Sequence, residues 1–156
     1  MIKVDEQRAV SDGHTSLAQN WYALQVLHDR IDTELERALQ QAHELSVREY
    51  SLLNVLSRQH DGIGGHLQMK ELATSVALSQ SATTRLVARL EDRGLLARYI
   101  CPTDRRGIYT DVSPSGLDLL EAARPTNNSA LGEALDSLSG EEEFSPLVDA
   151  LRASRK

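Results

Sequence analysis

Cysteine and aromatic residues are scarce in this chain. Its 156 residues include one cysteine, one tryptophan and one phenylalanine, and aromatic residues make up only 4% of the total. The single cysteine, Cys101, excludes an intrachain disulfide and a cysteine-rich metal site. Leucine and alanine dominate the apolar residues instead, which favours helices over sheets.

Long hydrophobic runs are missing as well. No stretch is long enough to cross a bilayer, and residues 1–6 lack the apolar segment of a signal peptide. There is also no glycine-rich phosphate loop, no nucleophile elbow and no histidine pair at metal-binding spacing. We therefore expect a cytoplasmic protein that is not an enzyme, needs no cofactor or metal, and does not bind a membrane.

Positive charge is in short supply overall, but it is concentrated in one place. The net charge of −6 argues against nucleic-acid binding when it is taken alone. Between Arg85 and Arg106, however, six arginines stand against three acidic residues, a local balance of +3 that leaves −9 for the remainder. A basic patch on an acidic body can hold DNA in one orientation while the body repels it elsewhere.

The first part of the chain predicts one long helix. Residues 1–14 are polar and should form an arm or a short helix, and residues 15–45 should form the long one. Eight residues spaced alternately by four and three positions form one stripe along this helix, and it is apolar except at one histidine: Leu17, Trp21, Leu24, His28, Ile31, Leu35, Ala38 and Ala42. A stripe of this length needs a helical layer or a second subunit to cover it.

Residues 46–113 predict a winged helix-turn-helix lobe. Ser46 and Glu49 have capping-box spacing, Ser79 is placed to cap a further helix, and Gly94 is placed to end it. A short helix from Met69 precedes that helix, and two strands follow it over 95–100 and 108–112, on either side of the loop 101–107.

The remainder of the chain, residues 114–156, predicts further helices. Pro125 should bend or break the first of them because proline removes a backbone hydrogen bond. Ser139 and Glu142 repeat the capping-box spacing and should open the last helix. The fold class is therefore mainly α with a small β-wing, a winged helix-turn-helix lobe held between N- and C-terminal dimerisation helices.

The basic second helix and the wing supply the candidate DNA contacts. The first turns of a recognition helix reach base edges, for which glutamine and arginine have suitable donor and acceptor patterns. Arginines at a hairpin tip can enter a narrow minor groove, with an aspartate to orient the guanidinium group. The candidates are Gln80, Ser81, Thr84 and Arg85 for bases, Asp104, Arg105 and Arg106 for the wing, and Lys70, Arg89 and Arg98 for phosphates.

The ordered set of these segments resembles the multiple antibiotic resistance regulator (MarR) family of winged-helix transcription factors, over roughly residues 17–152. The segments that carry the resemblance are 69–73 (MKELA), 84–95 (TRLVARLEDRGL), 104–106 (DRR) and 112–116 (VSPSG). The resemblance implies a homodimer on a pseudo-palindromic operator. It also implies repression that a small aromatic or phenolic effector relieves.

Effector and dimer contacts are assigned to the helices outside the wing. The effector candidates are Trp21 and His28 on the long stripe, with Arg48 and Tyr50 as polar contacts. The candidates for the dimer interface are Leu17, Leu24, Ile31, Leu147 and Leu151. Two alternatives remain open: a winged-helix module that binds another protein instead of DNA, and a regulator in which Cys101 senses redox state.

Overall fold

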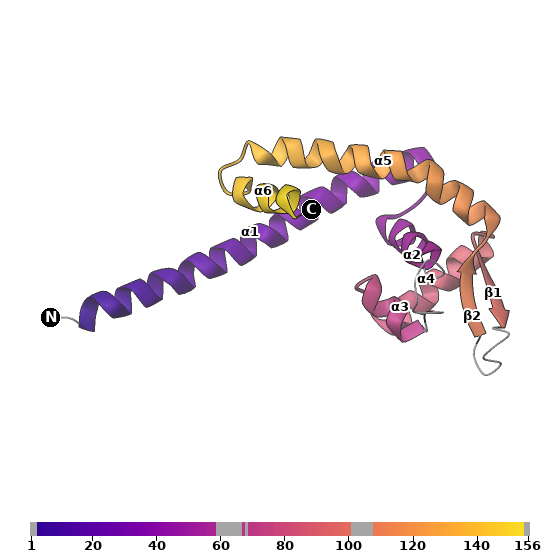
Figure 1. The fold of residues 1–156 in the computed structure, drawn as a ribbon, viewed down its shortest axis with the longest axis horizontal. Helices are drawn as coiled ribbons and strands as arrows, with labels where there is room; N and C mark the ends of the chain where they lie inside the picture. The colour runs from indigo at the N-terminus through magenta and orange to yellow at the C-terminus, as the bar shows by residue number, and fades with distance from the viewer. Residues whose placement is uncertain (1–2, 59–66, 68, 101–107, 155–156) are drawn as a thin grey trace. The chain divides into compact units, whose positions relative to one another are not determined.

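A computed structural model describes residues 3–58, 67, 69–100 and 108–154 of the chain. Six helices and two strands lie within these ranges (Figure 1). They are α1 (Lys3–His43), α2 (Val47–Ser57), α3 (Met69–Ser75), α4 (Gln80–Asp92), β1 (Leu96–Ile100), β2 (Ile108–Val112), α5 (Pro114–Ser139) and α6 (Ser145–Ala153). The chain is therefore mainly helical, as the sequence predicts.

Two compact units make up the chain. The terminal unit comprises Met1–Leu35 and Ser129–Lys156, and the central unit comprises Glu36–Asn128. The central unit is larger than the predicted lobe of residues 46–113, because helix ends on both sides belong to it. A carboxylate oxygen of Glu36 accepts a hydrogen bond from the backbone N–H of Val47 at 2.7 Å, and Arg124 donates to the side-chain oxygen of Asn54 at 3.0 Å.

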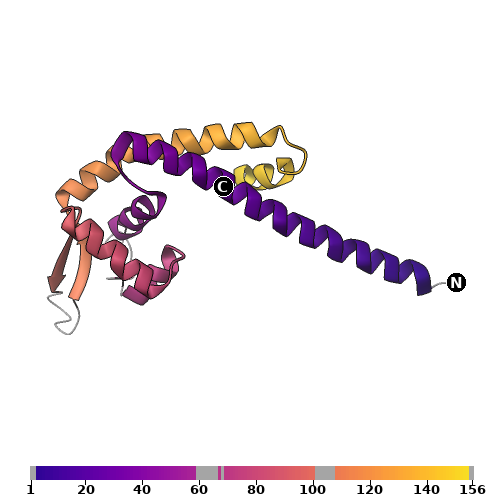
Figure 2. The ribbon, with the colours of Figure 1, turned by 180° about the vertical axis from the view of Figure 1, so that it is seen from behind.

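The terminal unit has a small apolar core. α6 folds back after α5 (Figures 1 and 2), and both pack on α1 through buried side chains, namely Ala23, Leu27, Leu138, Phe144 and Val148. Arg30 donates two hydrogen bonds to the carboxylate of Glu141, at 2.8 and 2.9 Å, and its guanidinium lies 5.4 Å from the centre of the Phe144 ring. The hydrogen bond from Arg30 lowers the pKa of Glu141.

The predicted starts of the first and the last helix of this unit differ from the structure. α1 begins at Lys3, so residues 3–14 continue the long helix where an arm or short helix was expected. The last helix begins at Ser145, and the predicted capping box at Ser139 is wrong. Ser139 is instead the last residue of α5, where its hydroxyl donates to the carbonyl of Asp136 at 2.8 Å.

In the central unit α2, α3 and α4 pack beside a two-stranded hairpin (Figure 1). α2 contacts both α3 and β2, and α4 contacts both α3 and β1. The strands are antiparallel, with Leu96 opposite Val112 and Tyr99 opposite Tyr109. The core of this unit is built from α2, α3, α4 and the strand ends, with Leu52, Leu53, Leu56, Leu72 and Leu90 all nearly inaccessible to solvent.

α5 runs through Pro125 without a break. Of the two predicted effects of Pro125, a bend or a break of the helix, the break is therefore wrong. Pro125 has no N–H to donate to the carbonyl of Glu121, four residues earlier in the helix. Both residues are exposed, so water can donate a hydrogen bond to that carbonyl instead. Contacts on either side hold the helix in place, because Arg124 bonds to Asn54, and His43 and Thr126 are joined by a 2.8 Å hydrogen bond.

The hairpin is tied closely to the start of α5. Ser113 donates from its hydroxyl to the carbonyl of Gly94 at 2.6 Å and accepts from the backbone N–H of Gly116 at 3.1 Å. A Cβ atom on Gly116 would lie 2.2 Å from the carbonyl oxygen of Leu95 and 2.7 Å from a methyl group of Val112. Only glycine allows this close approach, which holds the start of α5 against the end of α4 and the base of the hairpin.

Candidate nucleic-acid interface

The turn between α3 and α4 and the ends of α4 have the predicted geometry. Ser79 accepts a hydrogen bond from the backbone N–H of Ala82 at 3.2 Å, which caps the first turn of α4. Ala77, in the turn, has a positive φ of 54°, and Gly94, after α4, has a φ of 73°. After Gly94 the N–H of Leu95 bonds back to the carbonyl of Leu90, a Schellman ending that glycine favours.

α4 has one buried and one exposed face, as the sequence predicts. The buried face comprises Thr83, Leu86, Val87 and Leu90. The exposed polar residues are the predicted DNA contacts Gln80, Ser81, Thr84, Arg85 and Arg89, together with Asp92 at the C-terminal end. Thr84 donates its hydroxyl hydrogen to the carbonyl of Gln80 at 2.9 Å, so its oxygen is left to act as an acceptor. This face carries the donors and acceptors that base edges and phosphates require.

The three predicted phosphate contacts are exposed, but they differ in their present partners. Lys70 lies in the first turn of α3. Arg98 donates to the carboxylate of Glu91 at 2.7 Å, and this hydrogen bond raises the pKa of Arg98. Arg89 lies 4.0 Å from a carboxylate oxygen of Glu49. A phosphate would have to compete with Glu91 for Arg98, whereas the Arg89 side chain is only loosely held.

The predicted wing tip falls within residues 101–107. Asp104, Arg105 and Arg106 lie outside the described residues, as does Cys101. Their assigned roles in the minor groove and in redox sensing stay predictions from the sequence. The strands that support the tip are present, and the aromatic rings of Tyr99 and Tyr109 pack across them with centres 6.0 Å apart.

A buried carboxylate behind α4 was not recognised as part of the site in the sequence. Glu49 forms the predicted capping box with Ser46, but it also forms an ion pair with Arg93 at 3.3 Å. The capping spacing is visible in the sequence because it is local. The ion-pair partner of Glu49, Arg93 at the C-terminal end of α4, is 44 residues away, so no local sequence pattern predicts this pair.

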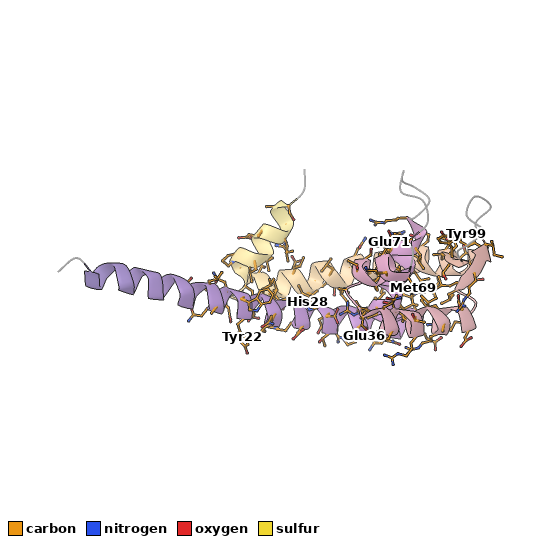
Figure 3. All side chains as sticks on the ribbon, turned by 90° about the horizontal axis from the view of Figure 1, so that it is seen from below. Tyr22, His28, Glu36, Met69, Glu71 and Tyr99 are labelled. Carbon is orange, nitrogen blue, oxygen red and sulfur yellow. The ribbon has the colours of Figure 1, made fainter. Side chains whose placement is uncertain are left out.

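The four effector candidates fall in different units. Trp21 and His28 are exposed on α1 in the terminal unit, where they line a hollow with Tyr22, Leu24 and Val26; Figure 3 labels Tyr22 and His28. Arg48 and Tyr50 belong to α2 in the central unit. Arg48 donates to the carbonyl of Val76 at 3.4 Å, near the end of α3, and burial raises the pKa of Tyr50.

The five dimer candidates also divide into two groups. Leu17, Leu24 and Leu151 are exposed in the single chain, together with Trp21 and Tyr22. Ile31 and Leu147 are half-buried and pack against the core of the terminal unit. The first group is free to contact a second subunit, whereas the second group already has partners within its own chain.

Within residues 3–58, 67, 69–100 and 108–154, no group of three histidine, cysteine or acidic side chains is placed to hold a metal ion. None of the helices described there is both long and apolar enough to span a membrane.

Comparison with known proteins places the winged region in a family. The model of the MarR family matches residues 43–107. The regulator MhqR of Bacillus subtilis is 28% identical over 100 residues, which cover 64% of this chain and 66% of that protein. Two other curated relatives are matched over 50% and 65% of their length. The chain therefore spans less than two thirds of the length of these relatives.

Solved structures agree with this assignment over a longer part of the chain. The DNA complex of Sco3205, a MarR family regulator of Streptomyces coelicolor, is 26% identical, with a TM-score of 0.65 over 85% of this chain and 84% of that one. CouR of Rhodococcus jostii, bound to p-coumaroyl-CoA, is also 26% identical, with a TM-score of 0.63 and 83% of both chains covered. The motifs on α3 and α4, the hairpin and these matches together show that the chain matches the MarR family over residues 43–107.

Proposed function

We propose that this protein is a sequence-specific DNA-binding regulator of transcription. The observation that supports this most directly is the division of α4, whose apolar face is buried while Gln80, Thr84 and Arg85 are exposed. Such a helix can enter the major groove and read base edges. The related Sco3205 was solved in complex with DNA, which supports the same role for this fold.

Exposed apolar residues on α1 and α6 support action as a homodimer. Leu17, Trp21, Leu24 and Leu151 would be covered by a second copy of the chain, at lower cost than leaving them in water. In a two-fold dimer the two copies of α4 would enter successive major grooves, about 10 base pairs apart on a pseudo-palindromic operator. Lys70, Arg89, Arg98 and the wing residues would supply phosphate and minor-groove contacts.

The protein would act as a repressor that a small molecule releases. CouR was solved with p-coumaroyl-CoA, which shows that a related protein accommodates an aromatic acyl group. Trp21, His28, Arg48 and Tyr50 are the candidate contacts for an aromatic or phenolic effector in this chain. Release requires that the effector bind more tightly to a form of the dimer that does not fit the operator. This role is regulatory rather than enzymatic, and it belongs in the cytoplasm.

The test selects duplexes from a randomised library and then compares variants on the enriched sequence. Arg85→Ala should weaken binding to that sequence by about 1–3 kcal/mol, the usual value of one good base contact. Arg152→Ala removes an exposed arginine from α6 in the terminal unit and should leave the affinity unchanged. The affinity of the parent protein should also fall steeply with salt. If no duplex is retained even at low salt, the DNA-binding role is wrong and the protein-interaction module takes its place.

A further inference from the structure

Glu49 is an unusual residue for the inside of a protein. Its side chain is almost completely buried, and it is the only charged residue in that class within the part of the chain that the structure describes. Burying a carboxylate is costly unless it is paired and hydrogen-bonded. The partners of Glu49 should therefore show what the burial achieves.

Those partners come from two helices. One carboxylate oxygen, Oε2, accepts from the backbone N–H of Ser46 at 2.8 Å and from Nη1 of Arg93 at 3.3 Å. The other, Oε1, lies 4.0 Å from Nη1 of Arg89. Glu49 thus joins the first turn of α2 to the C-terminal end of α4, and Arg89 and Arg93 are four residues apart on one side of α4.

The two arginines are held to different degrees. The Arg93 side chain is 32% exposed and within hydrogen-bond distance of Glu49, whereas Arg89 is 65% exposed and farther away. Arg93 therefore acts as the anchor. Arg89 can turn toward a phosphate without leaving a buried charge unpaired, because Arg93 remains on the carboxylate.

We propose that Glu49 is a positioning residue for the recognition helix, a role that rests on the proposed DNA binding. Apolar contacts along α4 are non-directional and tolerate small rotations of the helix about its axis. The pair between Glu49 and Arg93 is directional and joins the end of α4 to α2, so it fixes that rotation. The rotation decides which way Gln80, Thr84 and Arg85 point.

A competing role for Glu49 makes the opposite prediction. If its charge mainly drew Arg89 away from DNA, removing the charge would strengthen binding to every duplex alike. If Glu49 positions α4, removing the charge weakens binding to the preferred sequence and leaves binding to random DNA largely intact, because random binding depends on charge rather than on register.

The experiment uses Glu49→Gln in the full chain. The amide oxygen of glutamine can still accept from Ser46, so the cap is kept while the charge is lost. The ratio of affinities for the library-selected duplex and for a random duplex should fall about tenfold, the size of one misplaced base contact. Glu141→Gln, which removes an ion pair of the same chemistry in the terminal unit, should leave the ratio unchanged. Ser46→Ala breaks the cap and keeps the ion pair, and should also preserve the ratio.

A double-mutant cycle separates this inference from the proposed function. Glu49→Gln, Arg93→Gln and their combination should be non-additive, both in the affinity ratio and in urea unfolding. Additive effects, or an equal change of affinity on both duplexes, would overturn the positioning role. If the parent protein binds no duplex at all, DNA binding fails, and the unfolding cycle still decides whether Glu49 and Arg93 are coupled.

Discussion

At the scale of single residues, the close approach at Gly116 is the strictest requirement in the chain. The neighbour that a Cβ would meet is the backbone oxygen of Leu95, which cannot turn away as the end of a long side chain could. Ser113 and Gly116 together hold the end of α4 against α5. Their effect on the site is indirect, since neither is on the exposed face of α4.

Gly116→Ala should destabilise the protein by about 1–3 kcal/mol, the usual cost of overpacking, and it should lower DNA affinity by shifting the hairpin base. Gly132, in the same helix, has no atom within 4 Å of the added Cβ. Gly132→Ala should therefore stabilise the protein by roughly 0.5–1 kcal/mol, the helix preference of alanine over glycine. Urea unfolding of the two variants measures both effects. Equal effects at the two positions would contradict the assigned clash.

The sequence predicts the residues that begin and end the helices of the site well. Ser46, Ser79 and Gly94 each act on backbone groups within a few positions, so the short sequence around them carries the signal. The pairing of Glu49 with Arg93 joins residues that are far apart in the chain. No local pattern could have predicted it, because arginines and glutamates are common on exposed helix faces.

At the scale of elements, the helices were predicted in the correct order, but the starts of α1 and α6 differ from the prediction. The buried face of α4 follows directly from the sequence, because its positions have helical spacing and its partners lie nearby. In α1 the predicted apolar stripe through Leu17, Trp21 and Leu24 is exposed within the chain, while Ala23 and Leu27 are buried. The partners of Ala23 and Leu27 come from α5 and α6, more than a hundred positions away.

Pro125 tests the continuity of α5. Its ring is exposed, so Pro125→Ala should remove little packing and should restore the missing backbone hydrogen bond. We expect the free energy of unfolding to rise by up to about 3 kcal/mol, the penalty for proline inside a helix. Pro114→Ala, at the first position of α5, should change it little, since the N–H there has no helical partner to lose. Urea unfolding compares the two. A less stable Pro125 variant would show that the ring makes a contact of its own.

At the scale of the whole molecule, an acidic chain concentrates six of its 17 arginine and lysine residues between Arg85 and Arg106. The net charge of −6 describes the solution behaviour of the protein, whereas local charge decides where DNA can approach. The second whole-molecule feature is the row of apolar residues that one chain leaves uncovered on α1. The sequence predicts that a helical layer or a second subunit covers this row, and Leu17, Trp21 and Leu24 are left exposed by the chain's own described residues.

Substitutions of Leu24 and Leu27 on α1 distinguish a loss of dimer formation from a loss of folding. Leu24 is 40% exposed in the single chain, whereas Leu27 is 1% exposed. Leu24→Glu should place a charge in the subunit contact and weaken the dimer by about 100-fold or more, with helix content unchanged. Leu27→Glu should unfold the terminal unit. Light scattering and circular dichroism measure the two outcomes. A Leu24→Glu protein that is still dimeric at low micromolar concentration would show that the subunits meet elsewhere.

Trp21 is the only tryptophan in the chain, and its side chain is 61% exposed. All indole fluorescence of the protein therefore comes from one place on α1, beside His28 and the residues assigned to subunit contact and effector binding. An indole in water emits at longer wavelength than one in an apolar setting. The unlabelled protein thus has its own optical probe. The emission wavelength of Trp21 should report whether this surface is covered, either on dilution of the dimer or on titration with aromatic compounds.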